Sequence, residues 1–412
     1  MTVPFDSPNN RIFYACQAVF KEERNTEAGN GGDPTGATFL DGVQSVGVSS
    51  SNPANALYDN GRYERRFIQY GQQEIEITID RVINKGSDLF YSPASYANNY
   101  QTTHFLHANN FGSKGAKDDN DKVLRNYDIT LLYGPDQFQY IGSGAAGLDP
   151  DKDDIISVTY PNSIITNISY TLGVDGIRES ITLRTKNIKY NNDYSDLTAY
   201  TIPSLPQDGN ILKRQDFDLT ESGYGQSSLP TEVKQLFNFD TPELENDLQK
   251  IGIQSVSIDV SIDYTRLSDT GNWRGSENNK EYEQNRWEVV NLPISITCSF
   301  TGILRQSLPY HNFLNGGENK VRNVDNVYTK SLAQTSSTDW QEADREIKLV
   351  ALGVGSPQEY FIWDLGKKSY LTSIEYNGGD TGGSNVEATI NYTNQYSDFI
   401  SAKSTTVYDL TS

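Results

Sequence analysis

The chain has 412 residues, enough for two domains of ordinary size, and a formal net charge of −20. An acidic surface argues against a tight electrostatic grip on nucleic acid. No stretch is long and apolar enough to span a membrane, and the N-terminal residues lack the basic start and apolar core of a signal peptide, so we expect no membrane anchor. The two cysteines, Cys16 and Cys298, are too few for a secreted disulfide scaffold and are predicted to be free, buried thiols.

The first half of the chain contains short segments in which apolar and polar residues alternate, which is the period of a β-strand. In chain order they are Arg11–Phe20, Gly42–Val48, Gln73–Ile83, Tyr127–Gly134 and Ile165–Tyr190. The last segment contains the turn sequence Gly-Val-Asp-Gly and is therefore predicted to form a hairpin. Long polar stretches at Glu22–Thr38 and Ser113–Lys122 are predicted to be loops.

The second half contains similar segments in the same order, about 200 to 220 residues later. They are Ile211–Leu219, Gly252–Ile258, Leu292–Leu304, Arg345–Gly353 and Leu371–Tyr396. The clearest pair is GVQSVGV at Gly42–Val48 and GIQSVSI at Gly252–Ile258, which share Gly, Gln, Ser and Val at the same places. Such ordered pairs predict an internal duplication. We expect an all-β, mainly antiparallel fold of two tandem repeats: a first β domain at 1–196, a linker at 197–210 and a second β domain at 211–412.

Helical patterns are few. Thr231–Phe237 and Pro242–Lys250 are the best candidates, with a proline at or just before the first turn of each, and Tyr96–Asn109 is a weaker third. Further long polar stretches at Leu267–Arg286 and Asn315–Trp340 are predicted to be loops. The fold should therefore contain only minor helices.

Several motifs could carry chemistry, but each lacks a necessary part. Gly142–Gly147 matches a dinucleotide fingerprint, yet no helix pattern follows it. Asp149–Asp154 resembles the start of a calcium loop without its glycine and its final glutamate, which favours a solvated loop over a weak cation site. His104 and His107 could share a helix face, but His311 belongs to the other repeat. We therefore predict no catalytic, cofactor-binding or metal-binding residues, and no enzyme activity.

The stretch Tyr63–Tyr70 combines aromatic and basic residues, and Trp287 follows Arg286 in the second half. Nucleic-acid stacking is one interpretation of such a stretch. In an acidic β protein we favour a subunit or domain contact, because Tyr, Trp and Arg are enriched at protein interfaces.

A series of segments in the first half resembles virion tail proteins of tailed bacteriophages. In order, these segments are LDGVQSVGV, YGQQEIEITIDRVI, YDITLLYG and ITNISYTLGVDGIRESITL. The second half is similar to the same proteins over the segments KRQDFDL, SLPTEVKQLF, GIQSVSIDVSIDY and LPISITCSF. The resemblance covers most of both repeats, and it is one of pattern, without a catalytic signature.

The resemblance implies a tail-tube-like β-sandwich or barrel domain in each repeat, with a flanking helix and a long loop toward the next ring. Some such proteins fuse two domains in one chain, so that three chains make a pseudo-sixfold ring. It thus implies a homo-oligomeric ring, a trimer or a hexamer, stacked into a tail tube in contact with other phage tail proteins. Genomic DNA would pass through it without tight binding. The protein would belong to the virion tail and assemble in the host cytoplasm.

Other interpretations stay open at this stage. They are a baseplate or tail-terminator ring, a capsid decoration protein, and a β-sandwich glycan-binding or glycan-degrading module. The last would need a cleft with paired carboxylates.

For a DNA-conducting ring we expect an acidic or neutral bore, because basic residues along it would hold phosphates. The hairpin of the first repeat carries four basic residues that could oppose this: Arg178, Arg184, Lys186 and Lys189. Most of them are expected to point away from the bore.

Overall fold

The computed structural model describes residues 14–24, 37–52, 54–58, 65–70, 74–90, 126–135, 156–173, 175–191, 211–212, 216–218, 227–230, 233, 237, 252–266, 288–291, 293–303, 345–353, 359–378, 387–395 and 399–404. Strands dominate these residues, and all the strand pairs are antiparallel. The prediction of an all-β, mainly antiparallel fold is confirmed.

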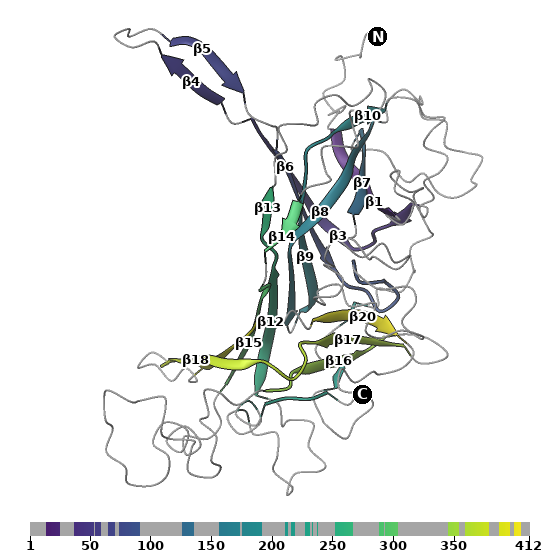
Figure 1. Cartoon of the computed structure of the whole chain (residues 1–412). Helices are drawn as coiled ribbons and strands as arrows, with labels where there is room; N and C mark the ends of the chain where they lie inside the picture. The colour runs from purple at the N-terminus through teal and green to yellow at the C-terminus, as the bar shows by residue number, and fades with distance from the viewer. Residues whose placement is uncertain are drawn as a thin grey trace, which may run out of the picture.

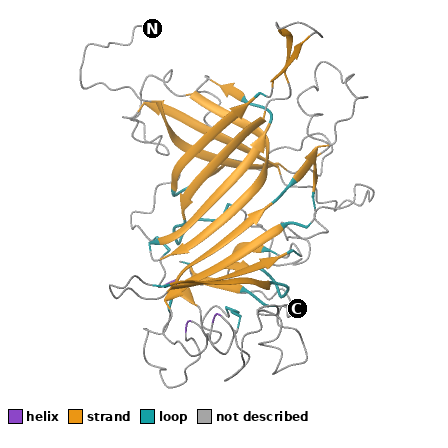
Figure 2. Ribbon diagram, turned by 90° about the vertical axis from the view of Figure 1, so that its left-hand side faces the viewer, coloured by secondary structure: helices purple, strands orange, loops and turns teal. Residues whose placement is uncertain are grey.

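The central element is a continuous run of strands, called here the main sheet, which crosses the molecule in Figure 2. Its order is β3 (Val43–Ser51), β6 (Glu74–Val82), β9 (Gly176–Thr185), β8 (Ile156–Gly173), β12 (Ile253–Ser261), β15 (Ser295–Ile303), β19 (Glu387–Asn394) and β18 (Tyr370–Asn377). Buried residues alternate with more exposed ones along β6, β9, β15 and β19. This period of two gives the sheet one apolar face and one polar face.

Two smaller strand layers contribute to the apolar core. The first layer contains β1 (Tyr14–Arg24), β2 (Thr38–Phe39), β7 (Asn126–Pro135), the start of β8, and β10 (Lys189–Asn191). The second is a separate sheet in the order β11 (Phe217–Asp218), β16 (Lys348–Leu352), β17 (Tyr360–Asp364) and β20 (Ile400–Ser404). The buried hydrophobic residues of the main sheet and of both layers form one core cluster.

Strand β8 belongs to both the first layer and the main sheet. Its early residues pair with β7 and β10, and from Ile164 onward it pairs with β9. The change occurs at Asn162, which has a φ of +52° and whose backbone N–H donates to Asp128 at 2.8 Å. Asparagine tolerates this left-handed conformation better than most residues, so a local bend redirects the strand without ending it.

The main sheet divides into two blocks of four strands with the same internal order. The first block is β3-β6-β9-β8 and the second is β12-β15-β19-β18. Each block has register shifts in the same two places. They lie at Val43/Ser45 and Ile165/Asn167 in the first block and at Ile253/Ser255 and Leu371/Ser373 in the second. The common origin of the two halves stays a prediction, which these matching features support.

The glycine that opens each repeated motif has a packing reason. A Cβ added to Gly42 would lie 2.1 Å from the carbonyl oxygen of Val82, and one added to Gly252 would lie 2.7 Å from that of Ile303. In both blocks the glycine carbonyl accepts a hydrogen bond from the facing residue, at 2.9 Å from Val82 and 2.8 Å from Ile303. Only a residue without a side chain allows this approach.

Two pairs of strands lie outside the two sheets. The hairpin of β4 (Ala54–Tyr58) and β5 (Arg65–Tyr70) projects away from the body beyond β6 (Figure 1). Strands β13 (Tyr264–Arg266) and β14 (Glu288–Val290) form the corresponding pair between β12 and β15. Most of the aromatic-basic stretch Tyr63–Tyr70 thus lies in β5 of a projecting arm, while its role as a contact stays a prediction.

Several predicted bounds are wrong. Strand β1 runs on to Arg24, three residues into the predicted loop, because it pairs with β7 over its whole length. Among the described residues of the segment Ile211–Leu219, Phe217 and Asp218 form a strand, and Ile211 pairs with Asn84. Within Thr231–Phe237, Val233 and Phe237 are helical and buried. The helices predicted at Tyr96–Asn109 and Pro242–Lys250 lie outside the described residues, as do the loops at Ser113–Lys122, Leu267–Arg286 and Asn315–Trp340 and the linker at 197–210.

Candidate functional surface: a polar sheet face between two sheet edges

The polar face of the main sheet is made largely of small hydroxyl and amide side chains. Each of its strands contributes at least one partly or fully exposed serine or threonine; examples, in sheet order, are Ser45, Thr78, Ser180, Ser169, Ser257, Ser299, Thr389 and Ser373. Strand alternation produces this face, because every second residue of each strand is directed away from the core.

Many of these groups hydrogen-bond one another across strands. In the first block the carboxylate of Asp80 accepts from Ser45 at 2.8 Å and from Ser180 at 2.5 Å. In the second block the Asn391 amide donates to Ser373 at 2.8 Å and accepts from Ser299 at 2.5 Å. These hydrogen bonds link the side chains to one another in a network along the face.

Acidic residues outnumber basic ones at the polar-face positions of these strands. The acidic ones are Glu74, Glu76, Asp80, Asp259, Glu375 and Glu387, and the basic ones are Arg178 and Arg184. Arg178 and Arg184, two of the four basic residues of the first hairpin, are thus on this face, since they alternate with buried residues of β9. Lys186 and Lys189 follow the end of β9.

The two blocks meet where β8 pairs with β12, a contact called here the junction. Its central residue is Tyr170, which is fully buried and lies opposite Ile258. The Tyr170 ring meets Trp363 edge-on at 5.8 Å and Phe399 at 6.3 Å, and its hydroxyl donates a hydrogen bond to Ser401 at 3.1 Å. Burial raises the pKa of Tyr170 well above its usual value, so the phenol stays neutral.

Polar contacts also cross the junction on its other side. Asn167 donates to Asp259 at 2.9 Å, and the hydroxyl of Tyr264 donates to the backbone oxygen of Ile165 at 2.6 Å. The guanidinium of Arg184 lies 5.8 Å from the centre of the Tyr264 ring, a cation–π distance. The junction thus combines a strand ladder, an aromatic cluster and charged contacts.

The main sheet ends at β3 on one side and β18 on the other. Among the described residues, no strand pairs with the outer side of either. Val48 of β3 is 40% exposed, whereas Ile258, at the corresponding place in β12, is 0% exposed. Edges with free backbone groups are sites where another strand can add.

The motifs singled out for chemistry cannot be placed. Gly142–Gly147, Asp149–Asp154, His104, His107 and His311 all lie outside the described residues. Within the described part of the chain, no three His, Cys, Asp or Glu side chains are grouped to hold a metal ion. Of the helical residues that the structure describes, none forms a helix long and apolar enough to cross a membrane.

The two cysteines are free, as predicted. Cys298 is buried, and burial raises its pKa above the usual value. The prediction that Cys16 is buried is wrong, because its side chain is only partly buried, although burial still raises its pKa to about 11. Neither thiol is activated as a nucleophile, since that requires a lowered pKa.

A scan against protein-family models finds no matching family, and a search of curated proteins finds no match. The geometry of the main sheet therefore provides the basis for inferring the function of the chain. Neither Tyr170 at the junction nor Val48 at the sheet edge was singled out from the sequence. One sequence pattern could have indicated Tyr170: Ile-Ser-Tyr ends at Tyr170, and the similar Ile-Glu-Tyr ends at Tyr376 in the paired segment.

Proposed function

We propose that this chain is a structural virion protein of a bacteriophage tail, forming stacked rings of the tail tube through which genomic DNA passes. The observation that carries the proposal is the side-by-side joining of two similar four-strand blocks in one continuous sheet. A chain built this way can continue the same sheet by adding further copies, and a repeated head-to-tail contact closes into a ring when its rotation allows.

The size of such a ring follows from strand geometry. Three chains would supply about 24 strands, and a strand spacing of about 4.8 Å with a tilt of about 40° gives a backbone radius of roughly 24 Å. That leaves a bore for a DNA duplex after side chains are included. In this arrangement the apolar face packs outward on the smaller strand layers and the polar face lines the bore.

The chemistry of the polar face supports this use. Its hydroxyl and amide groups are paired with one another, and its charged groups are mainly acidic. A surface of this kind gives phosphates few cations to pair with, so DNA is not retained by counterion release. Arg178 and Arg184 are local exceptions, and Arg184 is already engaged with Tyr264.

Purified full-length protein tests the proposal. Negative-stain microscopy should show rings or short tubes with a central bore, and light scattering should give a mass near a multiple of the 46.0 kDa chain, with three copies expected. Duplex DNA should not bind with sub-micromolar affinity at about 0.15 M salt. Discrete monomers at all concentrations, or compact oligomers without a bore, would contradict the proposed function.

A further inference from the structure

The junction inside one chain indicates which residues would face one another if the edges of two main sheets paired. In the first block Ile77 pairs with Val48, and in the second Cys298 pairs with Ile258, so Val48 and Ile258 hold the same place. Likewise Tyr170 of β8 and Tyr376 of β18 hold the same place, opposite Glu179 and Ala388. The junction places Tyr170 opposite Ile258. The corresponding contact between two copies would place Tyr376 opposite Val48.

The strand layers outside the main sheet can be matched in the same way. Ser163 pairs with Tyr127 just before β8 joins the main sheet, and Ser369 pairs with Arg345 just before β18 does so. Counting the same number of residues from Tyr127 and from Arg345, Leu131 of β7 corresponds to Leu349 of β16.

Their partners then correspond as well. Leu131 pairs with Val158, and Leu349 pairs with Trp363. Val158 and Trp363 therefore hold the same place. Tyr190 pairs with Val158 in the first layer, as Ser401 pairs with Trp363 in the second. Tyr190 therefore corresponds to Ser401, the residue that hydrogen-bonds the hydroxyl of Tyr170 at the junction.

This match accounts for the exposed apolar surface. Among the described residues, the large hydrophobic side chains that are exposed are Val48 at 40% and Tyr190 at 70%. Both correspond to residues that surround Tyr170 at the junction, Ile258 and Ser401, and both of those are buried. The two exposed side chains therefore hold the positions that surround a tyrosine at the junction.

We propose that β18 of one copy pairs antiparallel with β3 of the next, so that Tyr376 of the first copy inserts between Val48 and Tyr190 of the second. The register is that of the junction: Val48 opposite Tyr376, Ser49 opposite Glu375 and Gly47 opposite Asn377. This inference rests on the proposed head-to-tail ring and specifies its contact. Tyr376 is only partly buried within one chain, and the contact completes its enclosure.

Paired cysteines test the register. Facing residues of an antiparallel pair have Cα atoms about 4.5–5.5 Å apart, within the range that a disulfide spans. Ser49→Cys with Glu375→Cys should therefore form disulfides between copies under mild oxidation, giving covalent dimers and larger species on a non-reducing gel. Ser45→Cys with Ser373→Cys is the matched control, because that pair would be six residues out of register, roughly 20 Å along the strands. The control pair and the unsubstituted chain should not cross-link.

The outcomes separate this contact from the proposed function. Rings without cross-linking of the in-register pair, or equal cross-linking of the control pair, would overturn the contact and leave the tail-tube proposal standing. In-register cross-linking in an assembly without a bore would support the contact and overturn the tube. Neither cross-links nor rings would overturn both.

A second variant tests the apolar part of the contact. Val48→Asp should raise the concentration for half-assembly on the order of 100-fold or more, because an unpaired carboxylate would be buried against Tyr376. The monomer should keep its fold by circular dichroism, since the side chain is partly solvated in one chain. Ser257→Asp adds the same charge at an exposed position of the polar face away from both edges, and it should assemble as the unsubstituted chain does. Val48→Asp that assembles at the unsubstituted concentration would contradict the contact.

Discussion

The two blocks of the main sheet stabilise the same position in opposite ways. Where β6 meets β9 in the first block, the facing residues are Arg81 and Glu179, both buried. Where β15 meets β19 in the second block, they are Gly302 and Ala388. There the ring of Phe237 covers the glycine, so closely that a Cβ on Gly302 would lie 2.6 Å from it. One block thus uses an ion pair and the other an aromatic side chain to fill equivalent space.

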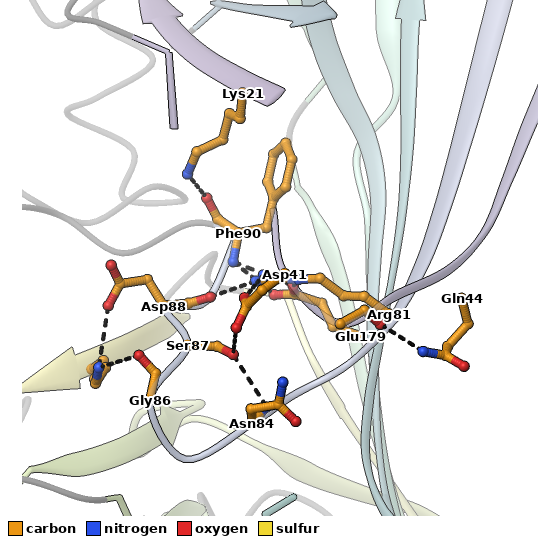
Figure 3. A network of polar contacts seen from close by, with 12 residues as sticks. Lys21, Asp41, Gln44, Arg81, Asn84, Gly86, Ser87, Asp88, Phe90 and Glu179 are labelled. Carbon is orange, nitrogen blue, oxygen red and sulfur yellow. Dashed lines mark hydrogen bonds and ion pairs between the residues drawn. The ribbon is translucent and has the colours of Figure 1, made fainter. Parts of the chain in front are cut away.

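The ion pair of the first block is the centre of a larger network (Figure 3). Arg81 donates to Glu179 and, at 2.6 Å, to the backbone oxygen of Asp88, while Glu179 accepts from the backbone N–H of Phe90 at 3.0 Å. Asp41 accepts from Ser87 at 2.5 Å. The buried charges therefore fix the segment that follows β6 against the sheet.

That segment also connects the two halves of the chain. Lys403 of β20 donates to the backbone oxygen of Gly86 at 3.1 Å and lies 3.5 Å from the Asp88 carboxylate. Lys85 pairs with Asp216 at 2.5 Å. The polar arrangement in the first block therefore also positions a connection between the two halves, whereas the described contact of Phe237 with Gly302 fills space.

The largest expected effect comes from breaking the ion pair. Glu179→Ala leaves Arg81 buried without its carboxylate and should destabilise the chain by about 3–5 kcal/mol. Replacing both residues together, Arg81→Met with Glu179→Leu, should cost less than the single change, because no buried charge remains. Urea unfolding in the Val48→Asp background measures both without a contribution from assembly. An equal or greater loss in the double variant would show that the network positions the segment more than it balances charge.

The apolar solution can be broken in the same way. Phe237→Ala should destabilise the chain by about 3–5 kcal/mol, toward the lower end, because it removes a buried ring and leaves a cavity above Gly302. Phe237→Leu keeps part of the apolar volume and should therefore destabilise the chain less than Phe237→Ala. Urea unfolding of the two variants measures the difference, and an equal loss for Phe237→Leu would contradict the role of the ring in filling this space.

The two glycines that open the repeated motifs differ in backbone conformation. Gly42 has a φ of +72° and Gly252 does not have a positive φ, although both approach a facing carbonyl. Gly42→Ala should therefore cost about 1–2 kcal/mol more than Gly252→Ala, the cost of a left-handed conformation for a residue with a Cβ. Thermal unfolding of the two single variants measures the difference, and equal losses would show that the carbonyl approach alone requires glycine.

The smallest effect concerns the exposed tyrosine. Tyr190→Ser introduces the residue found at the corresponding position, Ser401, and should weaken assembly by about tenfold, since one aromatic contact is lost. Unfolding of the monomer should change little because the side chain is mostly solvated. Sedimentation over a range of protein concentrations measures assembly, and unchanged assembly would show that Tyr190 is not part of the proposed contact.

Alternation in the sequence predicted most of the main sheet, because each strand has one buried face and the period of two is visible in any window. It could not predict the pairing of Arg81 with Glu179, since those residues are 98 positions apart and each looks like an ordinary exposed charge in its strand. Alternation also could not show that GVQSVGV lies in the edge strand β3 and GIQSVSI in the central strand β12 of the main sheet. A strand pattern records which residues face the core and says little about which strand lies beside it.

The bend at Asn162 has a mechanical consequence. Because β8 crosses between layers without ending, a pull on the first layer reaches the main sheet through one unbroken strand, which resists by shearing its hydrogen bonds together. In the second half the corresponding path passes between β17 and β18 through Gly366, at a φ of +73°, where the chain leaves the ladder before it re-enters. Under tension the second half is expected to yield first at that hinge, so that a stretched molecule lengthens on one side and stays stiff on the other.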